Sequence, residues 1–169
     1  MSGIDDALLL VMVALPFFGA LGLLGVPAER QTLVHRYGLV VSGVGLALTV
    51  YLFLAFETRG GDAFEFSYDW LPSLGVTLHL GVSGITAPLM LLNGIVFFAG
   101  TLVSRNITHR PKDFFVWLML LVAGVYGVFS SLDLFFFFFF YELAVVPMFL
   151  LIGVWGSSSD FRTFIRTKE

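Results

Sequence analysis

Long apolar segments separated by short polar ones make up most of the chain. A helix that crosses the hydrocarbon core of a bilayer, about 30 Å thick, needs roughly 20 mostly apolar residues. Five segments meet this requirement, at about 7–26, 37–56, 85–104, 114–130 and 132–156. The pattern predicts an all-α integral membrane protein, a single membrane domain of five transmembrane helices whose last two form an antiparallel pair.

The segment between the second and third predicted helices has a different pattern. Apolar and polar residues alternate there with a period of two, which is typical of a half-buried β-strand. The apolar positions are Phe64, Phe66, Tyr68 and Trp70 in the first run and Val76, Leu78 and Leu80 in the second. We expect a short β-hairpin over about 64–82 on the outer membrane face, where tyrosine and tryptophan rings favour the interface.

The composition supports a membrane location and excludes several functions. Of the 169 residues, 58% are hydrophobic and 12% are charged, whereas a soluble domain has about 45–50% and about 25%. The mean hydropathy is +0.95 and the net charge is −3. The chain therefore lacks the charged surface of a soluble enzyme and the basic patch of a nucleic-acid-binding protein. Without cysteine, and with three scattered histidines, it offers neither thiolate chemistry nor a convincing metal site.

Lysine and arginine are distributed unevenly across the predicted membrane. Eight of the nine fall on one side, namely Arg30, Arg36, Arg105, Arg110, Lys112, Arg162, Arg166 and Lys168. The other side has Arg59 and most of the acidic residues, namely Asp5, Asp6, Glu57, Asp62, Glu65, Asp69 and Asp133. Because lysine and arginine accumulate on the cytoplasmic side, we expect the N-terminus outside and the C-terminus in the cytoplasm or matrix.

Glu142 is the strongest candidate for chemistry, because it lies within about two residues of the middle of the fifth predicted span. An ionisable side chain at that depth costs at least about 2.5 kcal/mol. Desolvation favours the neutral form of such a carboxyl group and a nearby cation favours the charged form, so a balance permits proton exchange near neutral pH. We therefore predict that Glu142 takes up and releases a proton. The alternative is a protonated side chain that donates an interhelical hydrogen bond.

Pro147 follows Glu142 in the same span and is predicted to kink the helix. A proline has no N–H, so the carbonyl of Leu143, four residues earlier, loses its helical hydrogen bond. Inside a membrane that carbonyl needs another partner. The Glu142 carboxyl and the Leu143 carbonyl together are a plausible site for a water molecule, although a kink that serves packing alone is the alternative.

Three weaker features are expected to be structural. Asn93, near the middle of the third span, is interpreted as the donor or acceptor of an interhelical hydrogen bond. Asp133, at the outer end of the fifth span, is interpreted as a helix cap. The small residues at 123–127 have a spacing that favours close helix packing.

The segment 134–156 resembles the fifth helix of subunit M (chain 4) of proton-pumping NADH-quinone oxidoreductase, respiratory complex I. The resemblance rests on Glu142 and Pro147 in the spacing E-x4-P and on the ending Ile-Gly-Val-Trp-Gly at 152–156. Gly-Val-Phe at 127–129 and Leu-Asp-Leu at 132–134 resemble the turn before that helix.

The resemblance extends upstream. Asp-Trp-Leu-Pro at 69–72, followed by Leu-Gly-Val-Ser-Gly-Ile-Thr at 80–86, is similar to the outer hairpin that leads into the third helix of that family. Ser83 stands where the family commonly has aspartate. The resemblance is strong over about 60–165 and rests on hydropathy alone in the first two helices.

The resemblance implies a bundle of about fourteen helices built from inverted repeats, in which Glu142 pairs with a lysine on a later helix and takes part in proton translocation. No cofactor is expected on this chain, whereas NADH, FMN, iron–sulfur clusters and quinone belong to partner subunits. The expected partners are the lipid bilayer, other membrane-arm subunits and a chain that supplies the missing helices, because the sequence stops where the sixth helix would begin. The expected location is the bacterial plasma membrane or the mitochondrial inner membrane.

Two other functions remain open at this point. A subunit of an Mrp-type cation/proton antiporter would share the mid-membrane glutamate but would have no electron-transfer partner. A structural fragment without its own proton path would only pack and orient its neighbours.

Overall fold

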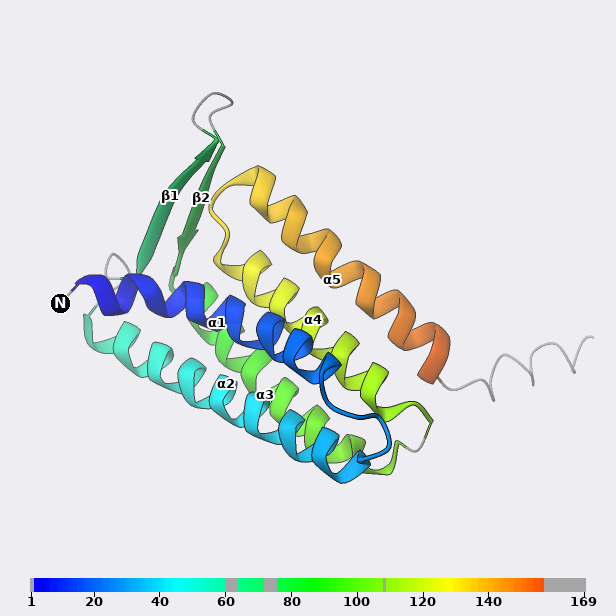
Figure 1. Ribbon diagram of the computed structural model, residues 1–169. Helices are drawn as coiled ribbons and strands as arrows, with labels where there is room; N and C mark the ends of the chain where they lie inside the picture. Colours follow the sequence, from blue (N-terminus) through cyan, green and yellow to red (C-terminus); the bar gives the residue numbers. More distant parts are fainter. Residues whose placement is uncertain (1, 60–63, 72–75, 108, 157–169) are drawn as a thin grey trace, which may run out of the picture.

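The computed structural model describes residues 2–59, 64–71, 76–107 and 109–156. Figure 1 shows a bundle of long helices with one β-hairpin at its end. The helices are α1 (Ser2–Leu24), α2 (Gln31–Arg59), α3 (Thr86–Val103), α4 (Pro111–Ser130) and α5 (Leu134–Trp155), the 3-10 turn η3 is Ser104–Asn106, and the strands are β1 (Glu65–Leu71) and β2 (Val76–Gly81). All five helices are long and apolar enough to cross a membrane. The predicted fold, five helices able to span a membrane with a β-hairpin between the second and the third, is therefore confirmed.

The observed helices are in part longer than the apolar segments that predicted them. Helix α2 begins at Gln31, where the apolar segment begins at 37, and it ends at Arg59 rather than 56. A hydropathy pattern marks only the part of a helix that lies in hydrocarbon, whereas backbone hydrogen bonds continue into the polar zone. Helix α4 begins at Pro111, a residue whose fixed φ suits the first helical position.

Helix α4 occupies the centre of the bundle and contacts α1, α2, α3 and α5. Half of its membrane-spanning residues are buried, against 17% of those of α5. Helix α5 packs mainly on α4 and lies at the edge of the bundle, beyond α4 when viewed from α3 (Figure 1). Most of the surface of α5 is therefore not covered by the other described helices.

The antiparallel hairpin joins the core at the connection between α4 and α5. Glu65 pairs with Gly81 and Tyr68 with Leu78, with an irregularity between Asp69 and Leu71. The N–H of Leu132 donates to the carbonyl of His79 at 2.8 Å. Phe64 and Leu80 are buried with core residues from several helices, namely Leu9, Met12, Leu52, Met90, Phe97 and Met119.

Candidate functional site

Helix α5 carries Glu142, and its first turn is anchored by a helix cap and by the hairpin. The Oδ1 atom of Asp133 accepts hydrogen bonds from the N–H groups of Phe135, at 2.8 Å, and Phe136, at 3.2 Å. The expected capping role of Asp133 is confirmed. The ring of Trp70 lies 5.4 Å from the ring of Phe136, between centroids, so strand β1 also contacts this turn.

The middle of α5 packs against two glycines of α4. A Cβ atom built on Gly124 would lie 2.7 Å from the backbone nitrogen of Ala144, and one on Gly127 would overlap the ring of Phe140. Only residues without side chains allow the helices to approach this closely. The small residues at 123–127 therefore serve packing, as expected from the sequence, although the contacts come from the pair Gly124 and Gly127.

The last turn of α5 is attached to the connection between α3 and α4. The indole Nε1–H of Trp155 donates to the carbonyl of His109 at 2.8 Å. The Trp155 ring also meets Phe114 edge to face, with ring centroids 5.6 Å apart. Sequence reasoning used Trp155 only for family resemblance and missed this role, because a hydrogen bond between residues 46 positions apart leaves no local pattern.

These three attachments determine the direction of Glu142. Phe140 and Ala144 are buried against α4, and Glu142 is two residues from each, about 200° around the helix. The Glu142 side chain is exposed and shares its face with the exposed Phe138, Val146 and Phe149. The ion pairs within the described ranges, His79–Glu65 and Arg110–Asp113, do not include it.

Pro147 lies on another face of α5. It is buried, and five residues correspond to about 140° around the helix from Glu142. The proline ring is thus enclosed by the bundle while the carboxyl group points away from it. The Leu143 carbonyl, which the proline leaves without a helical donor, is next to Glu142 in sequence.

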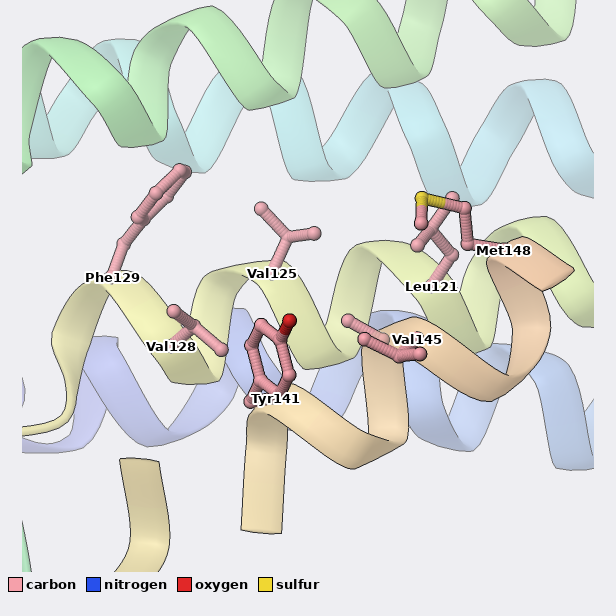
Figure 2. A pocket seen from close by; sticks show the side chains of 8 residues that line it. Leu121, Val125, Val128, Phe129, Tyr141, Val145 and Met148 are labelled. Carbon is pink, nitrogen blue, oxygen red and sulfur yellow. The ribbon is translucent and has the colours of Figure 1, made fainter. Parts of the chain in front are cut away.

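An apolar cavity of about 240 Å³ lies between α4 and α5. Figure 2 shows the side chains that line it, Leu121, Val125, Val128 and Phe129 from α4 and Tyr141, Val145 and Met148 from α5. Tyr141 contributes the one side-chain hydroxyl, which points between Val125 and Val145 (Figure 2). Glu142 does not line the cavity, so the cavity and the carboxyl group are separate features.

Two other observations concern polar groups in the part of the chain that the structure describes. The Nδ2 atom of Asn93 is buried without a hydrogen-bond partner there, so the interhelical hydrogen bond expected of this amide is not formed by that atom. The same ranges contain no group of three or more His, Cys, Asp and Glu side chains that could hold a metal ion.

Comparison with known proteins gives relatives over nearly the whole chain. The chain is 34% identical to "NAD(P)H-quinone oxidoreductase chain 4 1" of Synechococcus over 164 residues, 94% of this chain and 30% of the relative. It is 32% identical to the chloroplastic chain 4 of Chara vulgaris over 148 residues, 86% of this chain and 30% of the relative. This chain is a homologue of NAD(P)H-quinone oxidoreductase chain 4. It spans about 30% of the length of these chain 4 relatives.

Solved structures agree with the homology to chain 4. Respiratory complex I from Thermus thermophilus contains a chain that is 32% identical, with a TM-score of 0.73 over 87% of this chain and 29% of that one. A chain of the membrane-bound sulfane sulfur reductase, an archaeal respiratory membrane complex, shares the fold, with a TM-score of 0.66 at 17% identity over 82% of this chain and 28% of that one. No protein-family model matches the chain.

Proposed function

We propose that this chain is part of a membrane-arm subunit of an NAD(P)H-quinone oxidoreductase, the respiratory complex I type, and that Glu142 exchanges protons during translocation. The chain 4 relatives and the complex I structure support the assembly. The single observation that carries the role of Glu142 is its position. It is a carboxyl group near the middle of a membrane-spanning helix, on a face that α1–α4 do not cover.

A carboxyl group on such a face needs a polar partner, because an ionised side chain is costly in hydrocarbon. The contacts between α5 and α4 direct the Glu142 carboxyl group toward the helix or lipid that packs on the uncovered face of α5. A lysine of a helix outside this chain, which the family resemblance implies, would favour the carboxylate, and its withdrawal would favour proton uptake. The freed Leu143 carbonyl is a further acceptor for a water molecule near this carboxyl group.

The proposed role of this chain is translocation without a redox step. NADH, FMN, iron–sulfur clusters and quinone are assigned to partner subunits, and electron transfer there would drive proton movement through the membrane arm. The five apolar helices place the chain in a membrane. We assign it to an energy-conserving membrane with the N-terminus outside, on the basis of the lysine and arginine distribution.

The test is Glu142→Gln in the assembled oxidoreductase, measured in sealed vesicles as protons translocated per NADH oxidised. The amide keeps the size of the side chain but cannot titrate. We expect proton translocation to fall by about tenfold or more, with the chain present in the complex at its normal level. Glu142→Asp keeps a titratable group one methylene further back and should retain part of the pumping.

Glu57→Gln is the matched control, because Glu57 is an exposed glutamate near the end of α2. Normal pumping by both glutamine variants would contradict the role of Glu142 and support a purely structural chain. Purification of the chain with other antiporter subunits, and without flavin and iron–sulfur subunits, would favour the Mrp-type alternative.

A further inference from the structure

Two adjoining cavities form a groove between α1 and α2. One, of about 390 Å³, is lined by Val11, Ala14 and Phe18 of α1 and by Tyr37 and Val41 of α2, among others. The other, of about 330 Å³, is lined by Val26, Leu33, Arg36, Tyr37 and Val40. The two cavities adjoin each other, because Tyr37 lines both and the consecutive residues Val40 and Val41 line one each. We call the combined feature the α1–α2 groove.

Two glycines of α1 allow α2 to approach closely beside the α1–α2 groove. A Cβ atom on Gly22 would lie 2.5 Å from the hydroxyl oxygen of Tyr37, so the tyrosine side chain extends over α1 at this point. A Cβ atom on Gly19 would lie 3.0 Å from the side chain of Val41. The missing side chains let the two helices approach each other closely, and the exposed Phe18 and Val40 line the groove.

Charge is confined to one end of the groove. Arg36 is the one charged side chain that lines it, and it is exposed. Glu29 and Arg30, both exposed, lie just before α2 at the same end, so Arg36 is the charged group to which the headgroup site is assigned. From Leu24, beside this end, to Val11 the helix rises about 20 Å, and one leaflet of a bilayer has a hydrocarbon depth of about 15 Å. The groove therefore matches a molecule with an anionic head and one long apolar tail.

We propose that the α1–α2 groove binds an anionic phospholipid, with one acyl chain along Phe18 and Ala14 and the headgroup phosphate at Arg36. The walls alone select no lipid, because acyl chains are as apolar as the groove that they would fill. Selection comes from the guanidinium group, which pairs with phosphate oxygens and attracts a headgroup of net negative charge. Glu142 does not line this groove, although Ala14 and Phe18 also line an apolar cavity with Leu143 of α5.

The test measures lipid retention by the purified full chain after exchange into detergent supplied with equal amounts of phosphatidylglycerol and phosphatidylcholine. Bound lipid is counted by native mass spectrometry. The unchanged chain should retain phosphatidylglycerol in preference. Arg36→Gln should lower that preference by about fivefold, which corresponds to about 1 kcal/mol for one basic side chain near the membrane surface. Arg105→Gln is the matched control, since Arg105 is also exposed at this end of the bundle and does not line the groove.

A second pair of variants tests the acyl-chain part of the groove. Val40→Trp should fill the groove and lower retention of both lipids, whereas Val96→Trp on α3 should not. The two valines are similarly exposed, at 65% and 59%. Added inorganic phosphate should not displace the lipid, because it lacks the tail. The proposal would be overturned if Arg36→Gln and Arg105→Gln lowered the preference for phosphatidylglycerol equally. It would also be overturned if the unchanged chain showed no preference between the two lipids, which is the result expected if a partner helix occupies the groove.

Discussion

Gly124 of α4 lies directly against the backbone of Ala144 of α5, and this contact sets both the distance and the rotation of α5 relative to the bundle. Ala144 is two residues after Glu142, so the packing that buries one side of α5 turns the carboxyl group to the other. The position of the candidate proton-exchange group thus depends on a residue of another helix that has no side chain.

We predict that Gly124→Ala destabilises the contact between α4 and α5. The added methyl group would meet the backbone nitrogen and Cα of Ala144 at 2.7 and 2.9 Å, and a backbone cannot rotate away as a side chain can. Overpacking of this kind costs about 1–3 kcal/mol. The midpoint of thermal unfolding in detergent should fall.

Gly153→Ala is the matched control on α5, because nothing lies within 4 Å of a Cβ atom built there. In a helix interior this change reduces the entropy of the unfolded chain and stabilises by about 0.5–1 kcal/mol. The two glycine variants should therefore shift the unfolding midpoint in opposite directions. Equal shifts of one sign would contradict the close approach at Gly124.

Removing the cap of α5 should have a smaller and local effect. Asp133→Ala deprives the N–H groups of Phe135 and Phe136 of their acceptor, and loss of such a cap costs about 1 kcal/mol. Asp133→Asn should be close to the unchanged protein, because asparagine caps helices as well as aspartate. Amide hydrogen exchange at Phe135 and Phe136 is the measurement. Faster exchange in both variants would mean that the charge, and not the hydrogen bond, matters.

Features that depend on neighbouring residues were predictable from the sequence. The five helices follow from runs of apolar residues, the hairpin follows from alternation at Phe64 to Trp70, and the cap follows from an aspartate just before an apolar run. Each of these depends on interactions within one segment. The depth of Glu142 in the membrane was likewise predictable, because it follows from the number of residues between Glu142 and the ends of its apolar segment.

The direction of Glu142 could not be predicted, because α5 has no polar face to orient it. Six consecutive phenylalanines, Phe135 to Phe140, make every side of its first half apolar. Its rotation is decided instead by contacts with Gly124, Gly127 and His109, which lie on other segments at least 15 positions before Glu142. The sequence likewise could not show which helix faces Asn93, whose Nδ2 atom has no hydrogen-bond partner among the described residues.

The contact of Trp70 with α5 predicts that the two aromatic residues at the tip of β1 differ in importance. Trp70 meets the rings of Phe135 and Phe136, and an aromatic pair contributes about 0.5–1.5 kcal/mol beyond burial. Trp70→Ala should lower the unfolding midpoint and the yield of assembled complex without changing protons translocated per NADH. Tyr68→Ala is the control, because the exposures are similar, 60% against 54%. If Trp70→Ala changed the number of protons translocated per NADH while the complex remained intact, the hairpin would have a role in translocation.

The last prediction concerns the direction of the chain in the membrane. Eight of the nine lysine and arginine residues fall on the side of the connection between α1 and α2, and that side should be the cytoplasm or matrix. Because the chain has no cysteine, Gly61→Cys and Gly25→Cys each introduce a unique thiol, one in each of two successive connections. In sealed vesicles with the outer face exposed, a membrane-impermeant maleimide should label the thiol at 61 at once and the thiol at 25 only after the membrane is opened. Immediate labelling of both would contradict a membrane-spanning α2, and the reverse order would invert the orientation and place Arg36 on the outer side.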